Sequence, residues 1–303
     1  MTNIRSQIDT LKKEKNAVIL AHTYQPGEVQ DLADYVGDSY GLSVEASKTD
    51  ADVIVFCGVR FMAETAHILS PTRKVILPAA DAGCPMADMI TAQELSDLKA
   101  KHPDHLVMCY VNSTAEIKAL SDVCCTSSNA VKIANRLPKD KGIIFVPDRH
   151  LGSFVGEQTG QEMILWDGFC PTHVRIQPDM IEQARREHPA AQVLIHPEAP
   201  RGCRVLCDQV LSTGGMCDYV KESSHQEFII ATELGLIHTL QKQNPEKTFY
   251  PLSDKLVCPN MKKGSPELVL QALEGTAGEV ITLEQDVREK AQASLKKMLE
   301  LSR

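Results

Sequence analysis

Three cysteines that are each followed by proline divide this chain into near-equal parts. They stand in Cys84-Pro85, Cys170-Pro171 and Cys258-Pro259, and they are separated by 86 and 88 residues. None of the other cysteines precedes a proline. A near-constant spacing of this length is typical of an internal structural repeat, which constrains the fold more than any local pattern does.

The same register relates other residues of the three parts. When His22, Tyr110 and His196 are aligned, each part has a leucine, an aspartate and a hydroxyl residue at the same later positions. These sets are Leu32, Leu120 and Leu206; Asp34, Asp122 and Asp208; and Ser39, Ser127 and Thr213. The sequence therefore predicts a triplicated unit of about 87 residues.

Composition excludes several classes of protein. The chain has 303 residues, of which 43% are apolar, and a net charge of −8 with scattered basic residues. This argues against nucleic-acid binding as the main task. No apolar run has the length of a membrane span, and residues 1–10 lack a signal-peptide pattern. Ten cysteines without secretory features indicate a reducing compartment, so we expect a cytoplasmic protein.

Short apolar runs alternate with helical patterns in every unit, as Val18–Ala21 and Val53–Cys57 illustrate. This alternation is typical of parallel sheets covered by helices on both faces. We predict an α/β fold of three small domains with terminal helices at both ends. The predicted units are 16–100, 101–187 and 188–281, and the terminal helices are 1–15 and 282–303.

Some local signals fix expected helix boundaries. Residues 29–35 form a helical pattern, Ser39 is a natural N-cap, and Thr282 with Gln285 has the spacing of a capping box. The aligned polar residues and the Cys-Pro pairs come just after predicted strands, where ligands bind in open parallel sheets. If the three domains surround a pseudo-threefold axis, these residues meet in one central cavity.

Three converging thiolates favour a metal or cluster site. The spacing excludes zinc-finger and zinc-ribbon patterns, which need local Cys-x2-Cys pairs. Three thiolates leave one iron of a [4Fe–4S] cluster open for Lewis-acid chemistry, but a three-cysteine zinc site fits the sequence equally well. Three packing cysteines inherited by duplication are the simplest alternative. A second metal site at Cys203, Cys207 and Cys217 is a further hypothesis, while Cys124-Cys125 is interpreted as packing.

Polar residues near these positions are typical of a site that binds a small anionic substrate. Helices beginning at the three aligned hydroxyl residues would direct N–H groups toward the cavity. His22 and His196 can donate hydrogen bonds to carboxylates, and Glu198 is a candidate general base. Tyr24 and Tyr110 are candidate proton donors, and we expect His173 to lie near the metal.

The chain resembles the quinolinate synthase family, with matching motifs along nearly its whole length. The motifs are His22-Thr23-Tyr24-Gln25, Gly37-Asp38-Ser39, Ala82-Gly83-Cys84-Pro85-Met86-Ala87-Asp88, Tyr110-Val111-Asn112-Ser113, Pro147-Asp148-x2-Leu151-Gly152, His196-Pro197-Glu198, Ser212-Thr213 and Cys258-Pro259-Asn260-Met261-Lys262. One departure is Gly214-Gly215, where the family frequently has serine.

The resemblance implies three homologous three-layer αβα domains around a pseudo-threefold axis with a central active site. It implies a [4Fe–4S] cluster held by Cys84, Cys170 and Cys258. The implied reaction condenses iminoaspartate (iminosuccinate) with dihydroxyacetone phosphate to quinolinate, with loss of phosphate and water, in NAD biosynthesis. The implied substrate-binding residues are His22, Ser39, Tyr110, Asn112, Ser127, His196, Glu198 and Thr213. The implied catalytic residues are Glu198, Tyr24, His173 and Tyr110.

Two other classes of protein are weighed against this interpretation. An electron-transfer protein would give a cluster four protein ligands, and a zinc-dependent aldolase or hydrolase would bind one colourless ion. The resemblance also predicts functional coupling to an aspartate-oxidising enzyme, and no nucleic-acid or membrane partner.

Overall fold

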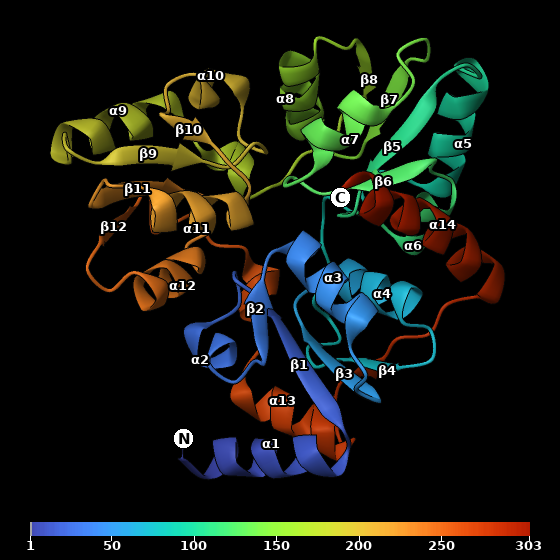
Figure 1. Ribbon diagram of the computed structural model, residues 1–303, viewed down its shortest axis with the longest axis vertical. Helices are drawn as coiled ribbons and strands as arrows, with labels where there is room; N and C mark the ends of the chain where they lie inside the picture. Colours follow the sequence, from blue (N-terminus) through green and yellow to red (C-terminus); the bar gives the residue numbers. More distant parts are fainter. Residues whose placement is uncertain (1) are drawn as a thin grey trace.

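The computed structural model describes residues 2–303 and contains three sheets in three lobes (Figure 1). The first sheet contains β1 (Ala17–His22), β2 (Tyr35–Gly37), β3 (Val53–Cys57) and β4 (Lys74–Leu77). The second contains β5 (Leu106–Tyr110), β6 (Val123–Cys125), β7 (Ile143–Val146) and β8 (Met163–Leu165). The third contains β9 (Gln192–Ile195), β10 (Gln209–Val210), β11 (Glu227–Ala231) and β12 (Thr248–Pro251).

Strand order is identical in the three sheets. In each, the first strand of the unit lies between the second and the third, and the fourth pairs with the third. All of these pairings are parallel. The central strands are continuous apolar runs because both of their faces are buried. The shared order confirms the predicted α/β fold built from three similar units.

The repeated aspartate has one structural task in all three units. Its carboxylate accepts a hydrogen bond from a backbone N–H of the central strand, at Ile19, Val107 or Val193, over 2.7–2.8 Å. Its own N–H donates to the carbonyl of that same residue. This double contact starts the edge strand β2, β6 or β10. The prediction of a helix over residues 29–35 was wrong, because the chain forms only α2 (Gly27–Gln30) before it continues into β2.

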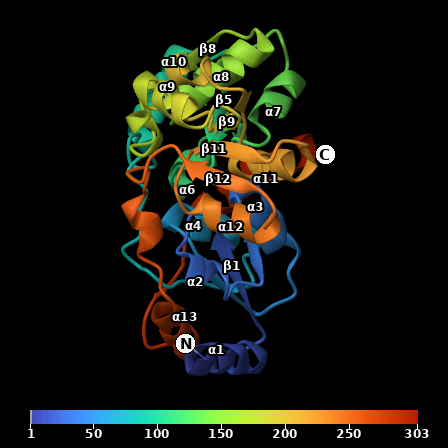
Figure 2. The same ribbon diagram turned by 90° about the vertical axis from the view of Figure 1, so that its left-hand side faces the viewer.

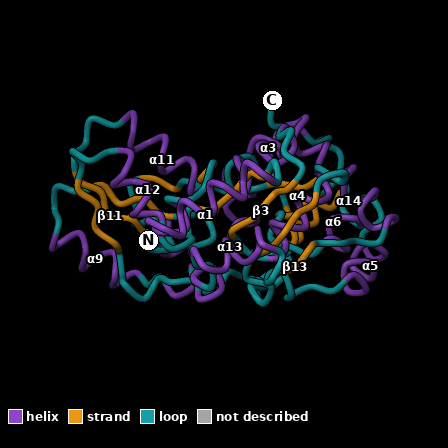
Figure 3. The backbone as a smooth tube through the Cα atoms, turned by 90° about the horizontal axis from the view of Figure 1, so that it is seen from below, coloured by secondary structure: helices purple, strands orange, loops and turns teal. Residues whose placement is uncertain are grey.

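Helices cover the sheets, and strands lie between them in the view of Figure 3. Those of the first unit are α3 (Ser39–Lys48), α4 (Arg60–Leu69) and α5 (Ala92–Lys101). The second has α6 (Ala115–Ala119), α7 (Ala130–Arg136) and α8 (Arg149–Thr159), whereas α9 (Pro178–Glu187) packs on the third sheet. The third has α10 (Arg201–Arg204), α11 (Thr213–Glu222) and α12 (Leu236–Gln243). Short 3₁₀ turns, His173–Arg175 and Pro259–Lys262, follow two of the Cys-Pro pairs.

The chain ends pack on different units. Helix α1 (Thr2–Glu14) packs against α13 (Pro266–Glu274) beneath the first sheet, and Ile8 is fully buried there. Strand β13 (Glu279–Val280) pairs antiparallel with β4. Residues predicted to end the third unit at 281 therefore complete the first sheet. Helix α14 (Gln285–Leu301) crosses to the second unit and packs on α6 and β6.

The capping box predicted at Thr282 is absent, since α14 begins at Gln285 with Glu284 as its N-cap and no side-chain cap bond. Figure 2 shows the lobe of the first sheet lying to one side of the other two, with α1 and α13 at its far end. Within residues 2–303, no helix combines the length and apolar character needed to cross a membrane.

Candidate functional site

The carboxyl ends of the three central strands open onto one cavity of about 70 Å³. His22 ends β1, Tyr110 ends β5, and His196 follows β9 directly. Binding sites of parallel sheets form at this edge, where loops leave the strands. Every residue predicted for the site lines this cavity: His22, Tyr24, Ser39, Cys84, Tyr110, Asn112, Ser127, Cys170, His173, His196, Glu198, Thr213 and Cys258.

The three Cys-Pro thiols reach the cavity from the three units. Burial raises the pKa of Cys84 to about 12, and the neighbouring Cys258 contributes to this shift. Burial also raises the pKa values of Cys170 and Cys258, with Glu198 adding to the effect at Cys170. Buried thiols of this kind become thiolates when a cation compensates their charge. The three-thiol donor set therefore fits a metal centre.

The remaining cysteines behave as packing groups. Cys57 and Cys124 are buried in the hydrophobic cores. Cys203 Sγ contacts the carbonyl of Ile176 at 3.2 Å, and Cys207 Sγ contacts the carbonyl of Cys203. The hypothesis of a second metal site there is not supported. Among the described residues, the one group with suitably close ligand atoms is Cys170, His173 and Glu198, whose atoms lie within 4.8 Å of one another.

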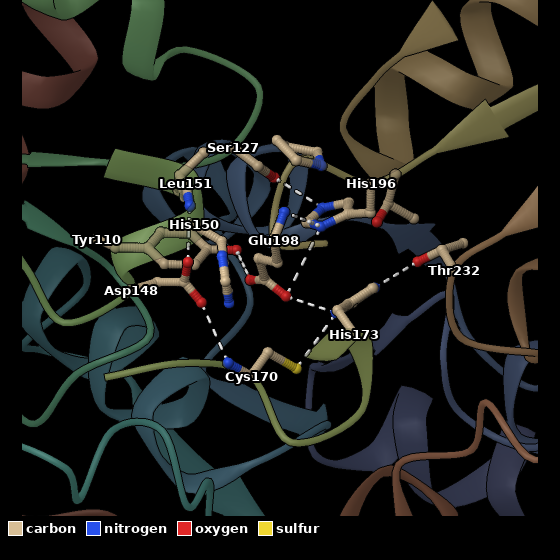
Figure 4. A network of polar contacts seen from close by, with 12 residues as sticks. Tyr110, Ser127, Asp148, His150, Leu151, Cys170, His173, His196, Glu198 and Thr232 are labelled. Atoms are coloured by element: carbon tan, nitrogen blue, oxygen red, sulfur yellow. Dashed lines mark hydrogen bonds and ion pairs between the residues drawn. The ribbon is translucent and has the colours of Figure 1, made fainter. Parts of the chain in front are cut away.

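Glu198 is the centre of the polar network in Figure 4. Tyr110 Oη donates to its Oε1 at 2.6 Å, and His173 Nδ1 lies 2.6 Å from its Oε2. Burial favours the neutral acid, but the nearby imidazoles of His173 and His196 and these hydrogen bonds outweigh it and lower the pKa of Glu198. Glu198 is therefore an ionised carboxylate that lies 3% exposed beside two proton donors.

A chain of hydrogen bonds leads from Glu198 to Tyr24. His173 Nε2 lies 2.7 Å from Thr232 Oγ1, which lies 2.7 Å from Tyr24 Oη. Tyr24 Oη also lies 2.8 Å from Thr213 Oγ1. Burial raises the pKa of Tyr24, so its phenol stays protonated. Thr232 connects the predicted residues, although it was not predicted itself.

The two histidines at strand ends are held in the same way. The N–H of Tyr24 donates to His22 Nδ1 at 3.1 Å, and the N–H of Glu198 donates to His196 Nδ1 at 3.4 Å. Burial lowers the pKa of His22 to about 4 and that of His196 to about 3. Since Nδ1 accepts in both, each neutral ring has its proton on Nε2 and can donate it to a ligand.

The hydroxyl residues lie at helix starts, but the residue before them is the cap. Asp38 accepts the N–H of Gly41 at 2.8 Å, and Ser212 accepts the N–H of Gly215 at 3.0 Å. The prediction of Ser39 as an N-cap was therefore wrong. Ser39 and Thr213 are the first helical residues, so their hydroxyls are not used as caps.

In the second unit, α7 begins only at Ala130, and Ser127 precedes it in a turn 3.2 Å from His196 Nε2. Ser128 Oγ joins the caps of the other two units, donating to Asp38 Oδ2 at 2.5 Å and lying 3.0 Å from Ser212 Oγ. A side chain at Gly214 would meet Asp38 Oδ2 at 2.8 Å. Glycine at position 214 therefore leaves room for the Asp38 carboxylate, which accepts the hydrogen bond from Ser128.

Asn112 and Thr126 line the cavity, and each has one buried polar atom without a partner in the described part of the chain. Asn112 Oδ1 and Thr126 Oγ1 are buried without a hydrogen-bond partner among residues 2–303. Such atoms are costly unless a ligand or water satisfies them. Asp148 and Glu233 are further buried groups near the cysteines that sequence reasoning missed. Asp148 lies in a quoted family motif, which is the signal that could have found it.

Comparison with known proteins shows the family of this chain. A model of the family described as quinolinate synthetase A protein matches residues 6–300. Curated proteins named quinolinate synthase are similar along the whole chain. That of Dehalococcoides mccartyi is 50% identical over 98% of this chain and 97% of its own. Those of Geobacter metallireducens and Caldicellulosiruptor saccharolyticus are each 51% identical over 99% of this chain and 98% of their own. The chain is therefore an enzyme that belongs to the quinolinate synthetase A family.

Proposed function

We propose that this enzyme condenses iminoaspartate with dihydroxyacetone phosphate to quinolinate, with loss of phosphate and water, as a step of NAD biosynthesis. The observation that carries the proposal is the single cavity in which three Cys-Pro thiols meet neutral histidines and an ionised Glu198. Family membership supports the same reaction. The roles below are assigned to this chain's residues on the geometry of that cavity.

Binding of a dicarboxylate is the first task of the site. His22 and His196 present Nε2–H donors from two units, and Ser39 and Thr213 add hydroxyls at the N-terminal ends of α3 and α11. Helix N-termini favour anions through their free N–H groups and dipole. The hydroxyl of Ser127 and the side-chain NH₂ of Asn112 complete the set. These donors orient a small acid without a lysine or arginine in the lining of the cavity.

Proton transfer is the second task. Glu198 is the base, because it is ionised and reaches the cavity between Tyr110 and His173. Glu198, His173, Thr232 and Tyr24 form a continuous chain of polar contacts, each 2.6–2.7 Å long, which links the protonation of Glu198 to that of Tyr24. The protonated phenol of Tyr24 then supplies the proton that a leaving hydroxyl requires.

Cys84, Cys170 and Cys258 are the residues that would hold a [4Fe–4S] cluster. The donor chemistry fits, because three partly buried thiols from three units line one cavity together with the buried, apolar Met86 and Met261. When bound through three cysteines, the cluster supplies an open iron as a Lewis acid for a substrate hydroxyl or carboxylate. We place this enzyme in the cytoplasm and expect its unstable imine substrate to come from an aspartate-oxidising enzyme.

A zinc-dependent reaction is the alternative function, and one observation favours it. Cys170, His173 and Glu198 offer a sulfur, a nitrogen and an oxygen within 4.8 Å, which is the donor set of a catalytic zinc ion. Metal analysis of anaerobically purified protein separates the two. We expect about four irons per chain and a brown colour, whereas one zinc in colourless protein would contradict the cluster.

The reaction itself is tested with aspartate oxidised in situ and dihydroxyacetone phosphate under anaerobic conditions, with quinolinate as the measured product. Cys84→Ala, Cys170→Ala and Cys258→Ala should each lose iron and product formation. Cys57→Ala is the matched control, since this buried thiol packs in another core and should keep both. Iron retention in all three cavity variants would remove the cysteines from the proposal.

A further inference from the structure

Two buried carboxylates occupy equivalent places in the second and third units. Asp148 stands two residues after β7, and Glu233 stands two residues after β11. Both are 0% exposed. A buried carboxylate is expensive unless several donors satisfy it, so the donors around each one indicate what it does.

In each carboxylate, one oxygen accepts a hydrogen bond from a helix start, and the other accepts one from a Cys-Pro loop. Asp148 Oδ1 accepts the N–H of Leu151 at 2.7 Å, and Glu233 Oε2 accepts the N–H of Gly235 at 2.7 Å. The other oxygen accepts the backbone N–H of a cysteine, Cys170 or Cys258, at 3.1 Å in both units. Figure 4 shows the first of these contacts beside Glu198.

The cysteine N–H is the last backbone donor before the proline in each loop. Pro171 and Pro259 have no N–H, so the carboxylate holds the last N–H of each loop, while the cysteine carbonyl accepts the N–H of Val174 or Met261. A rigid contact of this kind limits where the thiol can lie. Each carboxylate therefore holds its cysteine from the loop that follows β7 or β11, the third strand of its unit.

The first unit lacks this device. Val59 stands two residues after β3, and its apolar side chain lines the cavity. The loop before Cys84 is held instead by the N–H of Arg60, which donates to the carbonyl of Ala82 at 2.8 Å. A carboxylate thus holds the loops of Cys170 and Cys258, whereas a backbone hydrogen bond holds the loop before Cys84.

Glu233 carries an additional link that Asp148 does not have. Lys262 Nζ lies 2.9 Å from Glu233 Oε1 and also bonds the carbonyl of Tyr24. The anchor of Cys258 is therefore tied to the loop that carries Tyr24 in the first unit. Loss of the Glu233 carboxylate leaves Lys262 without its anionic partner.

We propose that Asp148 and Glu233 are positioning residues that hold Cys170 and Cys258 in place for the metal centre, each acting on its own cysteine. This inference rests on the proposed function, because it assumes that these thiols bind a cluster. It assigns no contact with substrate to either carboxylate.

Asp148→Asn and Glu233→Gln test the proposal with almost no change in shape. An amide has one acceptor oxygen, so it must turn its NH₂ toward one of the two N–H groups and lose that bond. Asp122→Asn is the matched control, since it alters a carboxylate that bonds the N–H of Val107, far in sequence from Cys84, Cys170 and Cys258. Each carboxylate variant is also the control for the other.

The first measurement uses metal-free protein and alkylation of each cysteine followed by mass spectrometry. Asp148→Asn should raise the alkylation rate of Cys170 about 5-fold or more while Cys258 and Cys84 stay near wild type. Glu233→Gln should raise that of Cys258 alone. An equal rise at all three thiols, or no rise, would overturn the assignment.

The second measurement uses iron-loaded protein and the rate of iron release to a chelator. Both variants should release iron about 5-fold faster than wild type or more, and Asp122→Asn should match wild type. Wild-type protein that takes up no iron would refute the proposed cluster, whereas iron-binding variants with unchanged release would refute this inference. If Glu233→Gln does not fold, the double variant with Lys262→Met removes both charges and takes its place.

Discussion

At the scale of single residues, the site depends on hydrogen bonds that fix protonation. The N–H two residues after each strand-end histidine bonds Nδ1, so His22 and His196 direct Nε2–H away from their own loops. Glu198 stays ionised between Tyr110 and His173. A buried site that combines neutral donors with one charged base suits a substrate that brings its own negative charges.

Glu198→Gln should keep iron and lose turnover by about 100-fold or more, because the amide cannot accept a proton. Quinolinate formation and iron content are measured on the same preparation. Glu187→Gln is the control, since this exposed residue ends α9 on the outer surface. Turnover near the wild-type value in Glu198→Gln would remove it from the proton-transfer steps.

The stability of the metal-free protein should fall as the pH is lowered. The folded pKa of His22 is about 4, below its ordinary value of about 6.5, so the unfolded chain takes up the proton first. The contribution is fully present above about pH 6.5 and is lost toward pH 4, at up to ~1.4 kcal/mol per pH unit. Urea unfolding at several pH values should show a shallower fall for His22→Gln, and equal slopes would contradict the prediction.

At the scale of elements, one contact decides where each unit places its second strand. Asp34, Asp122 and Asp208 bond the central strand through both carboxylate and backbone, which aligns the edge strand in register. The chain then enters the helix whose start faces the cavity.

Asp208→Ala should destabilise the protein by about 1–3 kcal/mol, because the N–H of Val193 loses its side-chain acceptor. The change is read as the free energy of unfolding in urea. Asp218→Ala, an exposed change on α11 in the same unit, should have little effect. Similar values for the two variants would show that the repeated aspartate is not structural.

At the scale of the whole molecule, the cavity exists only where three units meet. Arg204 of α10 joins the third unit to the second, with Nη1 donating to the carbonyls of His150 and Pro197 at 2.6 and 3.1 Å. Its Nη2 lies 3.0 Å from Glu157 of α8. Pro197 directly precedes Glu198, so this interface also holds the loop of the base.

Arg204→Met should lower stability by at least about 2 kcal/mol, because two buried carbonyls lose a charged donor. It should also reduce turnover through the displaced loop of Glu198, without loss of the cysteines' iron. Arg201→Met, which removes a more exposed arginine paired with the same glutamate, is the control. Unchanged unfolding and activity in Arg204→Met would exclude a role at the interface.

The sequence alone predicted the α/β class, the triplication and many of the residues that line the cavity. Those signals are local: buried central strands are continuous apolar runs, and duplicated chemistry repeats in register. The edge strands were not predicted, since β2 and β10 are two or three residues long and depend on one aspartate contact each.

Only the tertiary structure decided how the ends and the anchors are arranged. β13 joins the first sheet although it follows the third unit, because the edge of β4 offers unpaired backbone groups. Asp148 and Glu233 escaped the repeat pattern because the first unit has Val59 in their place. A periodic sequence reveals what three units share, whereas contacts between distant segments determine where they differ.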